Sequence, residues 1–197
     1  MSTVRRILLL QGHPDPERTH LGHALGDAYL EGARAAGHEV EVVHLSELDF
    51  PLLRSAAEFE RGEPPPVIAD VQQALLAADH VVLVMPLWLG DMPALVKAFL
   101  EQLLRPAFVR GTESFGNRPG GSRLRGRSVR LIITMGMPVP IYRLWFGAAA
   151  VRNLRRGVFG FVGLRPVRST LIGLAGGSDA RRAGWLKRVA ALGRRGV

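Results

Sequence analysis

Two loops of this sequence carry residues suited to holding a planar ligand that ends in a phosphate. The first loop, residues 12–22, follows an apolar segment and leads into a predicted helix, whose free N–H groups favour an anion. The second loop, residues 86–93, reads Pro-Leu-Trp-Leu-Gly-Asp-Met-Pro, and its large apolar side chains are poorly placed for solvent. We therefore expect a flat, apolar group to cover it. Together the loops favour a nucleotide cofactor with a wide aromatic ring system.

The elements that must position these loops alternate between strand and helix. Strands are predicted at Arg6 to Gln11, Glu39 to Leu45, Val81 to Met85, Arg127 to Met135 and Arg165 to Gly173. Helices are predicted from a Thr19 cap to Gly37, and at Val67 to Ala77, Pro93 to Leu104, Tyr142 to Arg155 and Asp179 to Arg195. The connections 46–66 and 105–126 show no periodic pattern. The alternation predicts an α/β fold, one domain over residues 1–197, with a five-stranded parallel sheet in the order 2-1-3-4-5.

In such a sheet, ligands bind outside the carboxyl ends of the strands, at the point where the strand order reverses. This rule places a third loop, residues 134–142, beside the other two. The second and third loops would supply backbone donors and apolar walls for a ring system, and the first would take a phosphate.

The same three loops carry motifs of a known family. The motifs are Gly12-His-Pro with Thr19-His-Leu-Gly-His-Ala, then Pro86-Leu-Trp-Leu-Gly-Asp-Met-Pro-Ala-Leu-Val-Lys, then Thr134-Met-Gly-Met with Tyr142 eight residues after Thr134. They resemble the NAD(P)H:quinone oxidoreductases of flavodoxin-like fold, a family that includes bacterial quinone reductases and ancillary proteins of potassium-efflux systems. The middle motif is the most specific, and the similarity extends along most of the chain. The resemblance implies a flavodoxin-like three-layer sandwich.

The resemblance also implies FMN or FAD as the cofactor, with a separate group of residues for each part of it. The phosphate and ribityl chain would be held by His13, Thr19 and Leu21. The isoalloxazine ring would lie along Pro86, Leu87, Trp88 and Leu89. The pyrimidine end of the ring would be bordered by Thr134, Gly136 and Met137, with Tyr142 beside it.

The implied reaction is hydride transfer from NAD(P)H through the flavin to a quinone-like acceptor, in a ping-pong order. The protein would contribute binding, orientation and hydrogen-bond donors aimed at the developing negative charge. The catalytic donors implied by the resemblance are the Tyr142 hydroxyl and the Gly136 backbone N–H. The chain departs from the family at three positions. Relatives commonly have glycine at the position of Met137, some have histidine at that of Ala148, and asparagine or serine is common at that of Gly22.

The composition limits the partners and the compartment. The net charge of +9 permits binding to nucleic acid or to an anionic membrane surface. Yet basic residues occur in every segment, with local concentrations only at 118–130 and 152–156, so nucleic acid is not expected as the main partner. The absence of cysteine excludes disulfides and thiolate ligands and fits a cytoplasmic protein. No metal is expected, because His20 and His23 lack a third ligand at a useful spacing.

Simpler readings of the same residues stay open. His13 can be an ordinary turn residue before proline, Trp88 can pack in the core or in a dimer interface, and Tyr142 can be a core tyrosine of an amphipathic helix. A one-electron carrier fits poorly, because such carriers are usually acidic. A flavin-binding redox sensor docked on a membrane transporter or on DNA remains the alternative function. The family pattern also implies a two-fold homodimer in which a second subunit completes the site.

Overall fold

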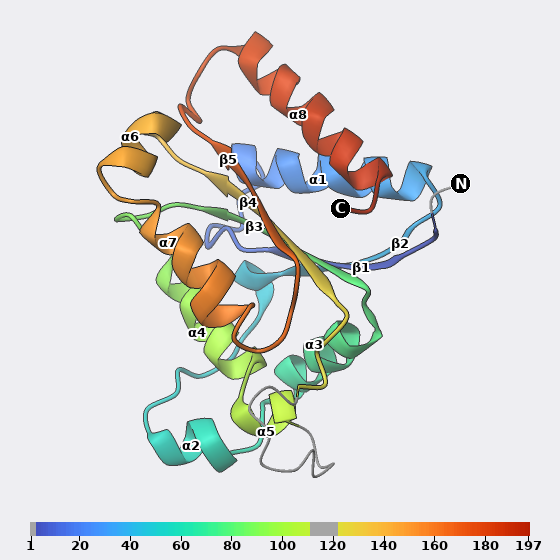
Figure 1. Ribbon diagram of the computed structural model, residues 1–197, viewed down its shortest axis with the longest axis vertical. Coiled ribbons are helices and arrows are strands. Elements are labelled where there is room, and N and C mark those ends of the chain that lie inside the picture. Colours follow the sequence, from blue (N-terminus) through green and yellow to red (C-terminus); the bar gives the residue numbers. More distant parts are fainter. Residues whose placement is uncertain (1–2, 111–121) are drawn as a thin grey trace.

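The computed structural model describes residues 3–110 and 122–197. Five parallel strands form one sheet between two layers of helices (Figure 1). The strands are β1 Arg6–Gln11, β2 Glu39–His44, β3 His80–Pro86, β4 Ser128–Thr134 and β5 Val167–Ile172. Their order across the sheet is β2-β1-β3-β4-β5, which confirms the predicted flavodoxin-like order. The order reverses between β1 and β3, so loops from both halves of the chain meet there.

The helices divide between the two faces of the sheet. Helices α1 Leu21–Ala35 and α8 Asp179–Arg194 lie on one face, and α3 Pro66–Ala77, α4 Ala94–Leu103 and α7 Ala149–Arg152 lie on the other (Figure 1). Shorter elements are α2 Ala56–Arg61, α5 Pro106–Arg110, α6 Val139–Leu144, a 3₁₀ turn at Leu45–Glu47 and a π-helical stretch, Asn153–Val158, that continues α7. Within the described residues, none of these helices is both long and apolar enough to cross a bilayer.

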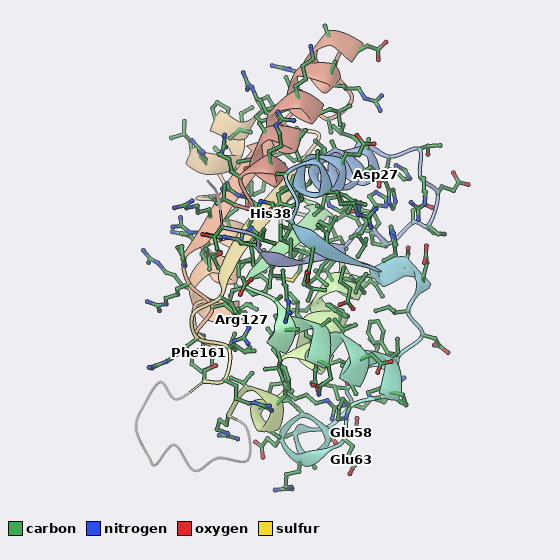
Figure 2. All side chains as sticks on the ribbon, turned by 90° about the vertical axis from the view of Figure 1, so that its right-hand side faces the viewer. Asp27, His38, Glu58, Glu63, Arg127 and Phe161 are labelled. Atoms are coloured by element: carbon green, nitrogen blue, oxygen red, sulfur yellow. The ribbon has the colours of Figure 1, made fainter. Side chains whose placement is uncertain are left out.

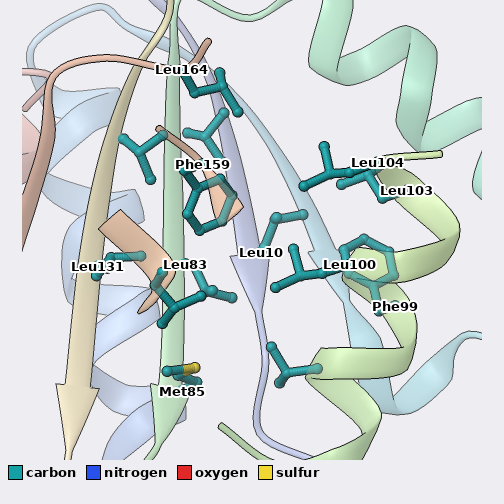
Figure 3. Close-up of a cluster of buried hydrophobic side chains, with 14 of the residues drawn as sticks. Leu10, Leu83, Met85, Phe99, Leu100, Leu103, Leu104, Leu131, Phe159 and Leu164 are labelled. Carbon is teal, nitrogen blue, oxygen red and sulfur yellow. The ribbon is translucent and has the colours of Figure 1, made fainter. Parts of the chain in front are cut away.

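The core lies on both faces of the central strands. Figure 3 shows Leu83 of β3 and Leu131 of β4 among the buried side chains of one face, together with Phe99 and Phe159. On the other face, β3 and β4 contribute Val82 and Ile132 to a second buried cluster under α1 and α8. Burial on both faces explains why β3 is apolar throughout and shows no alternation in the sequence.

Helices α1 and α8 approach so closely that two positions leave room only for glycine. A Cβ atom at Gly193 would lie 2.1 Å from the Tyr29 carbonyl oxygen, and one at Gly32 would lie 2.1 Å from the Ala190 carbonyl oxygen. A side chain at either position would force the helices apart, which a closely packed interior resists.

We expect Gly193→Ala to lower the free energy of unfolding by about 2 kcal/mol, because overpacking a closely packed contact costs roughly 1–3 kcal/mol. Gly184→Ala in the same helix is the matched control, since a Cβ atom there has no neighbour within 4 Å. Alanine favours a helix interior over glycine by about 1 kcal/mol, so this control should be at least as stable as the wild type. Urea unfolding measures both variants. Equal stabilities for the two variants would contradict the close contact.

Two of the predicted helices differ from the observed ones. The helix predicted at Tyr142 to Arg155 is interrupted: α6 ends at Leu144, and α7 begins only after Gly147 and Ala148, both in the left-handed backbone region with φ of +56° and +49°. Helix α6 also begins earlier than predicted, at Val139. Pro140 fits its first turn, because the N–H groups of the first turn have no partner within the helix and a missing N–H costs nothing there. Helix α1 has His20 at its N-cap position in place of the predicted Thr19, without a side-chain cap.

The connection 46–66 also holds structure that the sequence analysis missed. Helix α2 lies within it, and the Ser55 hydroxyl accepts a hydrogen bond from the Glu58 N–H at 3.1 Å while donating to the Glu58 carboxylate at 3.2 Å. The Glu58 carboxylate also accepts from the Arg54 N–H at 3.1 Å, so the pair caps the helix in the manner of a capping box, and the spacing Ser-x-x-Glu was the signal for it. The second connection, 105–126, contains α5, and its part at residues 111–121, with Arg118, lies outside the described residues.

Candidate functional site

Three loops meet where β1, β3 and β4 end, on the left of Figure 1. The strand register sets Pro86 beside Thr134. Two backbone hydrogen bonds join the loops beyond the sheet: the Gly12 N–H donates to the Val84 carbonyl at 2.7 Å, and the Leu87 N–H donates to the Thr134 carbonyl at 2.7 Å. The structure therefore brings the three predicted loops to one edge of the sheet.

Three histidines organise the first loop around Asp15. The ring of His13 stacks on that of His20, with centroids 4.1 Å apart, and lies 5.2 Å from the ring of His23. The Asp15 N–H donates to Nδ1 of His13 at 3.2 Å. The Asp15 carboxylate lies 2.9 Å from Nε2 of His20, and its carbonyl lies 3.0 Å from Nε2 of His23. We call these three side chains the histidine cluster.

The histidine cluster and the start of α1 fit a phosphate group. Burial, and then the neighbouring His20, lower the pKa of His13, so its ring is neutral near pH 7 with the proton on Nε2. Nδ1 of His23 is buried and has no hydrogen-bond partner among the described residues. The first N–H groups of α1 have no side-chain cap and can also donate to an anion. In the part of the chain that the structure describes, no three His, Cys, Asp or Glu side chains are placed to hold a metal ion.

The other two residues predicted for the phosphate differ in exposure. Thr19 is exposed in the turn before α1. Leu21 is buried in the core under α1, so its backbone rather than its side chain is available to a ligand. Sequence reasoning singled out His13 but left His20 and His23 without a common role. Their His-x-x-His spacing was visible, yet only the folded loop stacks His20 on His13.

The second loop forms a tight turn that exposes apolar side chains. The N–H groups of Trp88 and Asp91 each donate to the other's carbonyl at 2.9 Å. Between them, Leu89 and Gly90 have φ of +49° and +81°, the left-handed region in which a leucine is strained. Leu89 is fully exposed, and Trp88 is 47% exposed with its ring edge-on to His13 at 6.1 Å. The turn thus leaves about half of an aromatic side chain exposed beside the histidine cluster.

The third loop offers backbone access at Gly136. A Cβ atom built at Gly136 has no neighbour within 4 Å, so a ligand can approach its backbone without meeting a side chain. Thr134 is buried at the end of β4, while Met137 is partly buried and packs against the core. At the end of β3, Pro86 is buried and Leu87 is partly buried. The pairing of Pro86 with Thr134 therefore joins the start of the second loop to the start of the third.

Tyr142 is the predicted site residue whose position differs most from the expectation. Its side chain is fully buried, and its hydroxyl has no hydrogen-bond partner within residues 3–110 and 122–197. Burial raises the pKa of the Tyr142 hydroxyl, and the backbone N–H groups of Val151 and Ala150, which lie near it but outside hydrogen-bond geometry, partly offset this rise. The ring stacks on Phe146 with centroids 6.3 Å apart. In this structure α6 turns Tyr142 into the core, so the hydroxyl can contact a ligand only if α6 moves.

Large apolar side chains cover the surface around the second loop. They are Trp88, Leu89, Ile141, Leu144, Trp145 and Phe146, and we call them the apolar surface. A Cβ atom at Gly90 would lie 3.6 Å from the Phe146 ring, which shows that the turn and the end of α6 are neighbours. Leu144 and Trp145 are each more than four-fifths exposed. Sequence reasoning assigned them to a continuous helix and missed this surface. An exposed apolar surface of this kind marks a ligand or partner site.

A cleft of about 510 Å³ opens beside the third loop, between the start of α6, the loop after β5 and α8. Its walls include Leu174, Arg181, Trp185 and Arg188. The Arg188 guanidinium lies 5.0 Å from the centre of the Trp185 ring. No pattern in the sequence pointed to this cleft, because its walls come from three separate segments. An aromatic ring with two arginines suits a planar anionic group.

Known proteins similar in sequence include two named as NAD(P)H or NADH oxidoreductases and one named as an ancillary protein of a potassium-efflux system. An uncharacterized NAD(P)H oxidoreductase of Haemophilus influenzae is 29% identical over 171 residues, covering 84% of this chain and 82% of that protein. An FMN-dependent NADH:quinone oxidoreductase of Nitratidesulfovibrio vulgaris is 26% identical over 195 residues, covering 90% and 91%. The glutathione-regulated potassium-efflux system ancillary protein KefG of Shigella dysenteriae is 26% identical, covering 73% and 65%.

Solved structures agree with this fold. An NAD(P)H:quinone oxidoreductase from Methanothermobacter marburgensis superposes with a TM-score of 0.79 at 23% identity, covering 98% of this chain and 96% of that one. The family model described as flavodoxin-like fold matches residues 5–193, nearly the whole chain. These matches confirm the resemblance that the three loop motifs indicated. The chain belongs to the flavodoxin-like fold family.

Proposed function

We propose that this protein is a flavin-dependent NAD(P)H oxidoreductase that passes a hydride to a quinone-like acceptor. One observation carries the proposal: the half-exposed ring of Trp88 lies 6.1 Å from the ring of His13, centroid to centroid, so a planar apolar contact and a phosphate contact lie side by side. The two related oxidoreductases, one of them named as an FMN-dependent quinone reductase, support this activity. No covalent catalyst is required, since the cofactor carries the chemistry.

FMN is the cofactor that we propose first. The histidine cluster and the N–H groups of α1 would hold its phosphate. Trp88 and Leu89 would cover the ring, and Gly136 would let the ring's edge approach the backbone. FAD would need a further place for adenosine, and the cleft walled by Arg181, Trp185 and Arg188 is the candidate for it.

The residues of the chain would bind, orient and shield the reactants. When bound, the flavin accepts a hydride from NAD(P)H and returns it to the acceptor. Trp88 and Leu89 would exclude water from the ring, and the Gly136 N–H would donate toward the developing negative charge. A quinone takes up the hydride and one proton from solvent to become a hydroquinone. If NAD(P)H and the acceptor use the same place beside Trp88 in turn, NAD(P)⁺ would leave before the acceptor enters, which is a ping-pong order.

We further propose that a second copy of the chain packs against the apolar surface and completes the site. Six large side chains with this exposure are costly to leave in water, and two of them belong to the turn that would cover the ring. The dimer would have two-fold symmetry, so each copy would shield the other's ring.

Absorbance and steady-state kinetics test the proposal. The purified protein mixed with FMN should retain a flavin spectrum through gel filtration and oxidise NADH or NADPH with a benzoquinone, giving parallel initial-rate lines. Light scattering on the same sample should give twice the 21.5 kDa mass of the chain. A folded protein that binds neither FMN nor FAD would overturn the function. Intersecting rate lines would overturn only the ping-pong order.

The alternative is a redox-sensing subunit that binds a flavin and docks on a membrane transporter. The similarity to the potassium-efflux ancillary protein favours this second candidate. A sensor would bind FMN yet oxidise NAD(P)H too slowly to turn over an acceptor. The kinetic experiment above therefore separates the two functions.

A further inference from the structure

Acidic and basic residues separate between the two halves of this chain. Residues 1–110 hold 9 Arg and Lys against 15 Asp and Glu, whereas residues 122–197 hold 16 Arg and Lys against a single acidic residue, Asp179. Basic residues are also denser in the second range, with 16 in 76 residues against 9 in 110, so both signs of charge contribute to the separation. A charge asymmetry between halves indicates a partner with the opposite charge.

The strand order turns this asymmetry along the chain into an asymmetry in space. Strands β1, β2 and β3 come from the acidic half, and β4 and β5 come from the basic half at one edge of the sheet. The ion pairs of the described residues all lie in the acidic half, at Arg6–Glu39, Arg18–Glu47, His20–Asp15 and Lys97–Glu101. Among the described residues, the arginines after position 122 therefore make no ion pair.

Five of these unpaired arginines surround one exposed phenylalanine. They are Arg123, Arg125, Arg155, Arg156 and Arg165, and with Phe161 we call them the arginine surface. Hydrogen bonds join the segments that carry them: the Ser122 hydroxyl donates to the Val162 carbonyl at 2.5 Å, and the Arg165 N–H donates to the Arg127 carbonyl at 2.9 Å. The Gly160 N–H donates to the Arg155 carbonyl at 3.1 Å. The arginine surface is thus one patch built from three segments.

Phe161 protrudes from this patch. Its side chain is 83% exposed, although Phe159 and Val162 on either side are buried. The turn between Gly160 and Gly163, whose φ is +93°, holds Phe161 outward. In Figure 2, Phe161 lies at the margin of the molecule near Arg127, away from the acidic Glu58 of α2 and Glu63 just after it. The buried neighbours anchor the turn, so folding itself exposes the aromatic ring.

We propose that the arginine surface docks this protein on an anionic phospholipid bilayer. Arginines attract the anionic headgroups, and a protruding aromatic ring inserts at the boundary between headgroups and acyl chains. A duplex nucleic acid would also satisfy the charge, but inserting the ring there would require unstacking a base step, a cost that a bilayer does not impose. The arginine surface contains none of the residues assigned to the flavin, so this proposal can be tested independently of the proposed function. It would bring the enzyme to acceptors dissolved in the membrane.

Vesicle sedimentation tests this proposal on the whole chain. The protein should pellet with vesicles of phosphatidylglycerol and phosphatidylcholine, should stay in solution with phosphatidylcholine alone, and should be released by added salt. The double variant Arg125→Ala/Arg156→Ala should bind about thirtyfold more weakly, because each arginine near an anionic surface contributes about a fivefold gain. Neither side chain makes a hydrogen bond among the described residues, so the fold should be unaffected. Phe161→Ala should weaken binding roughly fivefold through lost apolar burial.

The matched control is Arg54→Ala/Arg61→Ala, which removes the same charge from exposed positions in the acidic half. This control should bind vesicles like the wild type, and melting temperatures should show that all variants fold. Equal binding to both vesicle compositions would overturn the proposal. An equal loss of vesicle binding in Arg125→Ala/Arg156→Ala and Arg54→Ala/Arg61→Ala would overturn it too. Tight binding of duplex DNA that depends on Arg125 and Arg156, without vesicle binding, would replace the membrane by nucleic acid and also overturn it.

Discussion

Replacing Trp88 with alanine should weaken FMN binding by about ten- to hundredfold, because stacking on an aromatic side chain is worth roughly 1–3 kcal/mol per ring. Trp88 is half exposed in a turn closed by its own backbone hydrogen bonds, so the fold should lose little stability. Quenching of FMN fluorescence on titration measures the affinity, and thermal unfolding checks the fold.

Trp185→Ala is the matched control, since Trp185 lies in the cleft beside α8 and not in the loop that would cover the ring. Its removal should leave FMN affinity unchanged. If Trp185→Ala weakens the binding of FAD but not that of FMN, the adenosine of FAD lies in the cleft. Unchanged FMN affinity in Trp88→Ala would refute the ring position that we propose.

FMN affinity should rise as pH falls from about 8 to about 6, and His13 should be the main cause. Without ligand, burial and His20 hold the pKa of His13 below its ordinary value, so the ring holds its proton weakly. A phosphate beside it stabilises the protonated ring and raises that pKa, so binding takes up a proton and is favoured by acid. Below a pH of about 6 the phosphate itself gains a proton and the rise should level off.

His13→Ala should remove most of this pH dependence and weaken FMN binding at pH 6 by roughly tenfold or more, since a hydrogen bond to a charged group contributes about 1.5–3 kcal/mol. Riboflavin is the matched ligand control, because it has the same ring and no phosphate. Its affinity should be independent of pH in the wild type and unaffected by His13→Ala. A pH dependence shared by riboflavin and FMN would place its origin at the ring and not at the histidine cluster.

The protonation of His13 also affects the stability of the protein without ligand. Because the folded state binds this proton more weakly than the unfolded chain does, His13 reduces stability as pH falls through the ordinary histidine range. A bound phosphate reverses the sign of this effect. The loop is therefore expected to be most stable in acid only when the flavin is present.

The fold was predictable because its signals are local. The apolar run of β3 and the alternation of strands with helices set the parallel sheet and its order, and parallel connections leave few other topologies. The break between α6 and α7 was not predictable, because Gly147 and Ala148 adopt left-handed backbone angles that composition does not specify. Helix α2 was missed although its capping pair, Ser55 and Glu58, stands in the sequence.

Which loops would meet followed from the order of elements along the chain, since strand order sets which carboxyl ends lie together, and the residue types singled out His13 and Trp88 within those loops. What each side chain does there depends on the folded loops. Folding stacked His20 on His13, turned Tyr142 inward and left Leu144 and Trp145 outside, because those directions depend on how a loop closes and where a helix breaks. The arginine surface arises in the same way. The sequence holds the unequal charges, but only the packing of three segments around Phe161 gathers them into one patch.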